Sequence, residues 1–162
     1  MVTVETPSPD EAGAVADLWV ALARDQRRHG SHLRGEANYA AVRASMARHA
    51  ADGSLTVARD EDGDLVGFVR YGIDSGPLTQ DATRGVVRDL FVVPSRRREG
   101  VGGTLLDAAE SCLRDRGAEV ITLDAMARND DAVRFYERRG YRPHRIEFEL
   151  EVETDKRSRR DR

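Results

Sequence analysis

The sequence is poor in several kinds of residue, and each shortage excludes a class of protein. It has a single cysteine, Cys112, so neither an intrachain disulfide nor a cysteine-based metal cluster can form. Its four histidines show no HExxH or similar spacing, and we expect no bound metal. No stretch approaches the roughly 18 apolar residues that a membrane span needs, and the N-terminus lacks a basic segment followed by an apolar one. We therefore expect a cytoplasmic protein without a membrane partner.

Charge is distributed unevenly along the chain. The formal net charge is −3 at pH 7, but Asp155–Arg162 holds five basic and two acidic side chains. The remainder has 21 basic and 27 acidic side chains, a net charge of −6. Because an acidic body repels phosphates, we expect no nucleic-acid partner. We predict one globular domain over residues 1–153, followed by a basic, disordered tail over residues 154–162.

Hydrophobic periodicity predicts an α/β protein with a mixed sheet and helices on both faces. A capping box at Ser8 and Glu11 starts the first helix, and the Asp60–Asp64 turn joins two strands of a hairpin. The predicted order is β-α-α-β-β-β-α-β-α-β. The expected strands are Val2–Glu5, Leu55–Arg59, Leu65–Tyr71, Val86–Val93, Val120–Asp124 and Tyr141–Val152. The later helices are expected at Asn38–Ala50, Gly100–Arg116 and Asn129–Arg139.

The most informative segment is the turn between the strand Val86–Val93 and the next helix. It reads Arg96-Arg97-Arg98-Glu99-Gly100-Val101-Gly102-Gly103. Glycines permit close approach to the N–H groups of a helix N-terminus, so the turn predicts a phosphate or pyrophosphate site. A dinucleotide motif fails because Leu105 stands where its third glycine belongs, and a P-loop fails because there is no lysine. A glycine-rich turn with solvated arginines remains the alternative.

This turn resembles the acyl-CoA loop of the GNAT superfamily of N-acetyltransferases. Arg97, Gly100 and Gly102 match the family pattern Q/R-x-x-G-x-G/A. A second family element follows at a suitable distance, namely Asn129-x-x-Ala132-x-x-Phe135-Tyr136-x-x-x-Gly140-Tyr141. The segment Leu65-Val66-Gly67-Phe68-Val69 is also similar. The resemblance covers about Leu55–Tyr141, and the order of elements extends it to nearly the whole body, which implies a GNAT-like mixed central sheet.

The resemblance implies that acetyl-CoA is the co-substrate. In this family, the strands that match Val86–Val93 and Val120–Asp124 splay apart, and the pantetheine arm lies in the opening. The arm would pair with main-chain groups of Phe91, Val92 and Val93. The pyrophosphate would bind the amides of Arg98, Gly100, Val101, Gly102, Gly103 and Thr104, with charge from Arg97. Asn129 matches the asparagine that contacts the arm, although it could also cap the short helix.

The resemblance also implies a reaction in which an amine attacks the thioester directly. A main-chain N–H near Val92 would stabilise the oxyanion, and Tyr136 matches the family tyrosine that protonates the departing thiolate. Without the motif, Tyr136 would be interpreted as a core aromatic with one satisfied hydroxyl. Some family members carry a glutamate base at the position of Val86, so the base is missing there.

The candidates for the base, or for contacts with the acceptor, lie elsewhere in the chain. They are His32, Glu36, Asp89 and Asp124. The loop His29–Glu36 matches the region that usually walls the acceptor site in this family, although it could equally be a solvated loop.

We therefore predict an acetyl-CoA-dependent N-acetyltransferase that acts on a small-molecule or peptide amine without a metal, and we leave a homodimer open. Two alternatives remain at this point. One is a non-catalytic module that binds acyl-CoA. The other is an acetyltransferase for protein N-termini or lysines.

Overall fold

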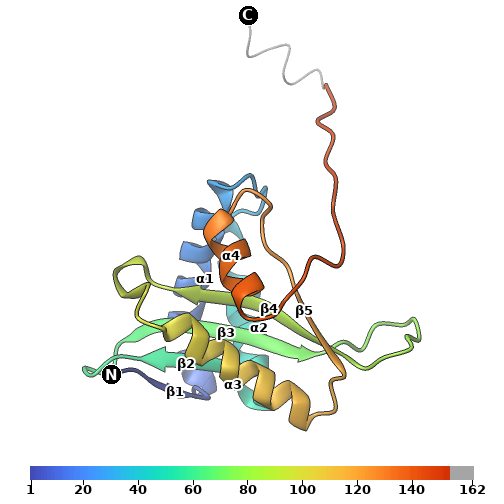
Figure 1. Ribbon diagram of the computed structural model, residues 1–162. Coiled ribbons are helices and arrows are strands. Elements are labelled where there is room, and N and C mark those ends of the chain that lie inside the picture. Colours follow the sequence, from blue (N-terminus) through green and yellow to red (C-terminus); the bar gives the residue numbers. More distant parts are fainter. Residues whose placement is uncertain (154–162) are drawn as a thin grey trace, which may run out of the picture. The chain divides into compact units, whose positions relative to one another are not determined.

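The computed structural model describes residues 1–153 (Figure 1). The chain divides after Asn129 into two compact units, Met1–Asn129 and Asp130–Arg162. The first unit holds the strands β1 (Thr3–Glu5), β2 (Leu55–Arg59), β3 (Leu65–Ile73), β4 (Arg84–Val92) and β5 (Val120–Leu123), and the helices α1 (Ala12–Arg27), α2 (Tyr39–Asp52) and α3 (Val101–Asp115). The second unit holds the helix α4 (Asp130–Arg138). Short 3-10 turns occupy Pro9–Glu11, Glu36–Asn38 and Pro94–Arg96. The predicted tail, 154–162, lies outside the described residues.

The five strands form one mixed sheet in the order β1-β2-β3-β4-β5. β1 to β4 are antiparallel neighbours, and β4 pairs with β5 in parallel after the crossover through α3. The α/β class, the mixed sheet and the antiparallel-then-parallel arrangement are therefore confirmed. The hairpin strand β2 begins and ends where the sequence predicted, because the Asp60–Asp64 turn is fixed by its own hydrogen bonds.

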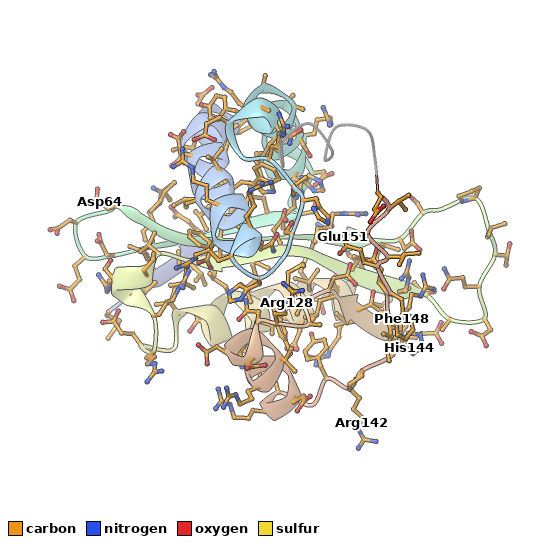
Figure 2. All side chains as sticks on the ribbon, turned by 90° about the horizontal axis from the view of Figure 1, so that it is seen from above. Asp64, Arg128, Arg142, His144, Phe148 and Glu151 are labelled. Carbon is orange, nitrogen blue, oxygen red and sulfur yellow. The ribbon has the colours of Figure 1, made fainter. Side chains whose placement is uncertain are left out.

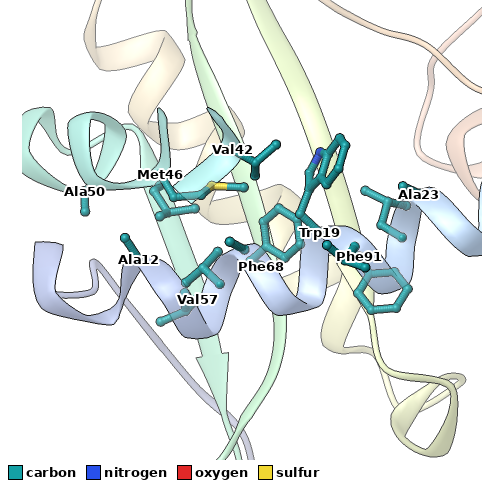
Figure 3. Packing of buried hydrophobic residues seen from close by; sticks show 14 residues of the cluster. Ala12, Trp19, Ala23, Val42, Met46, Ala50, Val57, Phe68 and Phe91 are labelled. Carbon is teal, nitrogen blue, oxygen red and sulfur yellow. The ribbon is translucent and has the colours of Figure 1, made fainter. Parts of the chain in front are cut away.

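Helices cover both faces of this sheet (Figure 1). On one face, α1 and α2 enclose the main core, in which Trp19 and Met46 meet Phe68 and Phe91 from the sheet (Figure 3). Phe68 and Met46 are fully buried. On the other face, α3 packs on β2, β3 and β4 with its buried leucines. This stack of apolar side chains holds β4 and the start of α3 in fixed positions relative to each other.

An extra residue in β4 changes which face of the sheet its side chains point to. Arg70 pairs with Asp89 but Tyr71 pairs with Val87, so Arg88 is a β-bulge. Phe91 lies in the core under α1 and α2. Gly85, at the other end of the strand, instead faces Leu113 of α3. Odd-numbered residues of β4 therefore face opposite layers before and after the bulge.

The pairing between the parallel strands β4 and β5 ends at the bulge. β4 pairs with β5 only from Arg84 to Val87, opposite Val120 to Leu123. The remainder of β4, Arg88–Val92, has no strand on that side in the described part of the chain. We call Arg88–Val92 the open half of β4 and the end of its pairing with β5, beyond Val87 and Leu123, the strand split. The resemblance implied that these two strands splay apart, and their pairing ends at this point.

The prediction of a final strand at Tyr141–Val152 is wrong for the described structure. Residues 141–153 form neither helix nor strand, and Phe148 is 89% exposed (Figure 2). Ile146, Leu150 and Val152 are exposed as well. Alternating apolar residues give a segment two distinct faces, but a strand also requires a paired edge, which a period-2 pattern does not specify. Within the described residues, no helix is long and apolar enough to cross a membrane.

Candidate functional site

The start of α3 presents main-chain N–H groups without a side-chain cap. Gly100 is the N-cap residue and has a φ of +82°, a conformation that favours glycine. Arg98, two residues earlier, has a φ of +65°. Thr104 N–H donates to Gly100 O at 3.1 Å, so helical hydrogen bonding begins there and leaves the N–H groups of the three preceding residues at the helix end. These preceding residues are Val101, Gly102 and Gly103. The turn is therefore suited to an anion.

The open half of β4 offers unpaired peptide groups beside this helix end. Val93 N–H donates to Val66 O at 2.9 Å, which places Val93 in a hydrogen-bonded pair with β3. Peptide groups alternate in direction along an antiparallel strand, so those of Leu90 and Val92 point away from β3, toward the strand split. The peptide of Phe91 points toward β3, like that of Val93. Leu90 was not predicted, because its direction depends on the register that the bulge sets.

Arg97 already uses part of this open edge. Its Nε donates to Val92 O at 2.9 Å, and its guanidinium lies 5.5 Å from the centre of the Phe91 ring. A third contact, 3.4 Å long, reaches Asp25 in the last turns of α1. Burial, with a smaller effect of the Arg28 charge, lowers the pKa of Arg97. The Arg97 side chain therefore connects the glycine-rich turn before α3 with the open half of β4 and with the C-terminal end of α1.

Tyr136 and Asn129 lie at opposite sides of the boundary between the two units. Asn129 directly precedes α4, and its N–H donates to Met126 O at 2.9 Å. Tyr136, in α4, makes edge-on contacts with the rings of Phe135 and Tyr141, at centroid distances of 5.3 and 6.0 Å. Burial raises the pKa of Tyr136 to about 12. The phenol is therefore protonated at neutral pH, as a proton donor must be.

The loop that was predicted to wall the acceptor site lies beside the segment that follows β5. A Cβ on Gly30 would sit 3.4 Å from the guanidinium of Arg128. His32 in this loop is exposed, and its carbonyl accepts a hydrogen bond from Arg27 at 3.2 Å. Glu36 forms an ion pair with Arg24.

Asp89 is the most enclosed of the candidate bases. Arg70 Nε donates to its Oδ2 at 2.6 Å, and both side chains are largely buried. Burial raises the pKa of Asp89, while Arg70 and a hydrogen bond from the Trp19 indole act in the opposite direction. Arg70 also donates to Ser45 Oγ at 2.8 Å. The carboxylate is thus committed to an internal network that sequence patterns did not reveal, since its partners come from α1, α2 and β3.

Two further groups of carboxylates are Asp124 and the Asp60–Asp64 turn. Asp124 is exposed and follows β5 directly, where the strand split begins. At the tip of the β2–β3 hairpin, where Figure 2 labels Asp64, the carboxylates of Asp60, Asp62 and Asp64 lie close together. Asp60 accepts hydrogen bonds from the N–H groups of Asp62 and Asp64, each at 3.0 Å, and these bonds close the turn.

Comparison with known proteins gives one consistent family. The model of the acetyltransferase (GNAT) family matches residues 16–141, more than half of the chain. An uncharacterised N-acetyltransferase of Bacillus subtilis (strain 168) is 29% identical over 140 residues, covering 86% of this chain and 89% of its own. The aminoalkylphosphonate N-acetyltransferase of Salmonella typhimurium is 30% identical over 72% of this chain and 75% of its own length.

Solved structures agree at the level of the fold. A GCN5-related N-acetyltransferase from Ralstonia eutropha JMP134 has a TM-score of 0.72 and is 24% identical. The match covers 94% of this chain and 99% of that chain.

Proposed function

The chain belongs to the GNAT family of acetyltransferases, and we propose that it transfers the acetyl group of acetyl-CoA to a primary amine by direct attack in a ternary complex. Family membership makes it an acyltransferase, so the alternative of a non-catalytic module is set aside. One observation carries the proposal. An uncapped helix end for a pyrophosphate adjoins an open strand edge for an amide-containing arm.

The helix end would bind the pyrophosphate of acetyl-CoA. The N–H groups of Val101, Gly102 and Gly103 point out of the first turn of α3, where the helix dipole favours negative charge. Arg98 would add a cation from the preceding turn. Arg97 would have to leave Val92 O for that carbonyl to accept a hydrogen bond from the arm, and its guanidinium could then turn toward the phosphates. Asn129 would contact the arm.

The open edge would align the thioester with the amine. Leu90 and Val92 supply peptide groups for the arm, and the Val92 N–H would stabilise the oxyanion that develops on the acetyl carbonyl. The C–N bond forms as the C–S bond breaks. The ammonium form of the acceptor loses two protons in the reaction. One of them replaces the proton that Tyr136 gives to the thiolate of CoA, and the other is released to solvent. Holding both substrates in one site would supply much of the acceleration.

Asp124 is the base that the geometry favours. Glu36 and Asp89 are engaged in ion pairs, whereas Asp124 is exposed beside the strand split and forms no ion pair with the described residues. A lysine-like amine has a pKa near 10.4, so it must lose a proton before attack. Asp124 would accept this proton directly or through a water molecule. His32 remains in the neighbouring loop as a contact for the acceptor.

Thermal unfolding with acetyl-CoA tests the cofactor assignment. At about 100 times its dissociation constant, acetyl-CoA should stabilise the fold by roughly 2.7 kcal/mol, which corresponds to a rise in Tm of roughly 5–11 °C. Gly102→Val should abolish this rise because its side chain blocks the helix end, whereas Gly76→Val in the β3–β4 loop should preserve it. The absence of a shift with the unaltered protein, or a normal shift with Gly102→Val, would overturn the assignment.

Amine-dependent release of free thiol tests the transfer itself. Small-molecule amines, peptides with free N-termini and peptides with lysines should be compared at saturating acetyl-CoA. We expect turnover with small amines, a class that includes the acceptor named for the Salmonella relative. Turnover of the peptides alone would support the protein-acetyltransferase alternative, and no turnover with any amine would refute the proposed reaction.

A further inference from the structure

Two oppositely charged side chains flank the strand split. β4 and β5 pair as far as Val87 and Leu123, and the next residues along the two strands are Arg88 and Asp124. Both are exposed. Because the strands run parallel, these residues follow the last pair at the same level of the sheet. A molecule entering the split would therefore meet a guanidinium from one strand and a carboxylate from the other.

A second exposed arginine, Arg48, acts electrostatically on the same histidine as Arg88. The pKa of His49, in α2, is lowered by burial and by the charges of Arg70, Arg88 and Arg48. Arg70 is neutralised by Asp89 within the core. Arg48 and Arg88 are both exposed, and neither forms an ion pair with the described residues. Arg48 of α2 and Arg88 of β4 thus provide two guanidinium groups available to an anion.

The acidic groups near these arginines are already engaged. Asp74 forms an ion pair with Arg84 at 2.6 Å. This contact lowers the pKa of Asp74, and the charge of Arg88 contributes to a smaller extent. Asp52, which acts on His49, accepts hydrogen bonds from the N–H and hydroxyl of Ser54. The positive patch therefore persists locally, although the body as a whole is acidic. The acidic body alone would favour a cationic acceptor, whereas this patch favours an anionic group.

We infer that the amine acceptor is a small zwitterion, an amine that carries a carboxylate or phosphonate group. The inference rests on the proposed acetyl transfer. Arg88, assisted by Arg48, binds the anionic oxygens through charge-assisted hydrogen bonds. Asp124 faces the amine end and attracts its ammonium form. The bulge sets this specificity, since it places Arg88 at the first position of the open half of β4.

A panel of matched amines tests the inference. The probes are 2-aminoethylphosphonate and β-alanine, each compared with ethanolamine, which lacks the acid, and with cadaverine, which carries a second cation instead. We expect kcat/KM for at least one acidic probe to exceed that for ethanolamine by about tenfold or more, as expected for a hydrogen bond to a charged group. Equal or better turnover of ethanolamine or cadaverine would overturn the inference and leave the proposed acetyl transfer intact.

Substitution of Arg88 tests the residue assignment. Arg88→Gln should raise KM for the acidic probe about tenfold or more and leave that for ethanolamine unchanged, and Arg88→Lys should recover part of the loss. Arg43→Gln, an exposed arginine earlier in α2, is the matched control and should change neither value. The Tm rise with acetyl-CoA should be preserved in all three variants. Unaltered discrimination in Arg88→Gln would remove Arg88 from the acceptor site.

Direct binding separates failure of the inference from failure of the proposed function. If no amine is acetylated, calorimetric titration with 2-aminoethylphosphonate still reports on the anion site. If the unaltered protein binds this probe and Arg88→Gln does not, the anion site is supported although the proposed acetyl transfer is refuted. Absence of both turnover and binding would overturn the two together.

Discussion

Tyr136 is the residue on which catalysis by proton transfer depends in the proposed reaction. Burial raises its pKa to about 12, so its phenol is still largely protonated near pH 10.4, where about half of a lysine-like amine is neutral. The same burial makes the folded state favour the neutral phenol. This favourable effect is complete below pH 10 and is lost as the pH rises through about 12.

Tyr136→Phe should keep acetyl-CoA binding and lose turnover. Removal of a general acid typically costs about 10²–10⁴ in rate, while the phenyl ring preserves the contacts with Phe135 and Tyr141. Steady-state kcat together with the Tm rise on acetyl-CoA addition measures both effects. Tyr141→Phe is the control in the same unit and should retain most of the rate. Undiminished turnover in Tyr136→Phe would exclude Tyr136 as the acid.

Gly67 lies where the packing leaves no room for a side chain. A Cβ at this position would lie 2.7 Å from Phe91 O and 3.0 Å from a methyl group of Leu105. Gly67→Ala should therefore destabilise the fold by roughly 1–3 kcal/mol, measured by urea unfolding. Gly72→Ala, in the same strand with no atom within 4 Å, should change stability by less than about 1 kcal/mol. Equal stabilities of the two variants would contradict the close approach of β3 and β4.

Among the elements, β4 shows where prediction from sequence succeeds and where it stops. Its hydrophobic run and Pro94 predicted the strand almost to its ends, and the following glycines predicted the start of α3. The bulge at Arg88 was not predicted, because it is defined by the pairing of β4 with β3 and no residue in the sequence of the strand marks it. The candidate bases Asp89 and Glu36 were chosen from sequence without their ion pairs to Arg70 and Arg24, because those partners come from distant elements. The alternation in Tyr141–Val152 predicted a strand that the described structure lacks.

α2 should make folding stability sensitive to pH through His49. Its pKa is lowered in the folded state, first by burial and then by neighbouring arginines, so the unfolded chain binds a proton more readily. Stability is full above about pH 6.5 and declines as the pH falls through 6.5 toward the lowered pKa. Urea midpoints between pH 7.5 and 5 should show a smaller decline in His49→Gln than in the unaltered protein. His144→Gln controls for the loss of a histidine, and identical declines in both variants would exclude this role for His49.

At the scale of the whole molecule, apolar side chains are divided unequally between the two units. The first unit buries its large apolar residues on both faces of the sheet. In the second, Ile146, Phe148, Leu150 and Val152 are 70–89% exposed. Exposed apolar residues in a row promote association rather than folding stability. Stability and self-association should therefore respond to different sets of residues.

Two phenylalanine substitutions separate these properties. Phe68→Ala should lower the free energy of unfolding by about 3–5 kcal/mol, because Phe68 is fully buried. Phe148→Ala should change it by less than about 0.5 kcal/mol and should reduce self-association in sedimentation velocity runs at high protein concentration. A large loss of stability in Phe148→Ala would show that the segment is buried in solution.

The extra residue in β4 also predicts which kinds of mutation the gene tolerates. A substitution at position 88 keeps the number of residues in β4, so the other side chains of the strand stay on the same face of the sheet. Deletion of the codon for Arg88 would instead slide one half of the strand past the other. Either Asp89 and Phe91 would turn toward α3, or Gly85 and Val87 would turn toward α1 and α2. In a library of point mutants and single-codon deletions, position 88 should therefore accept most amino acids for folding and reject their removal.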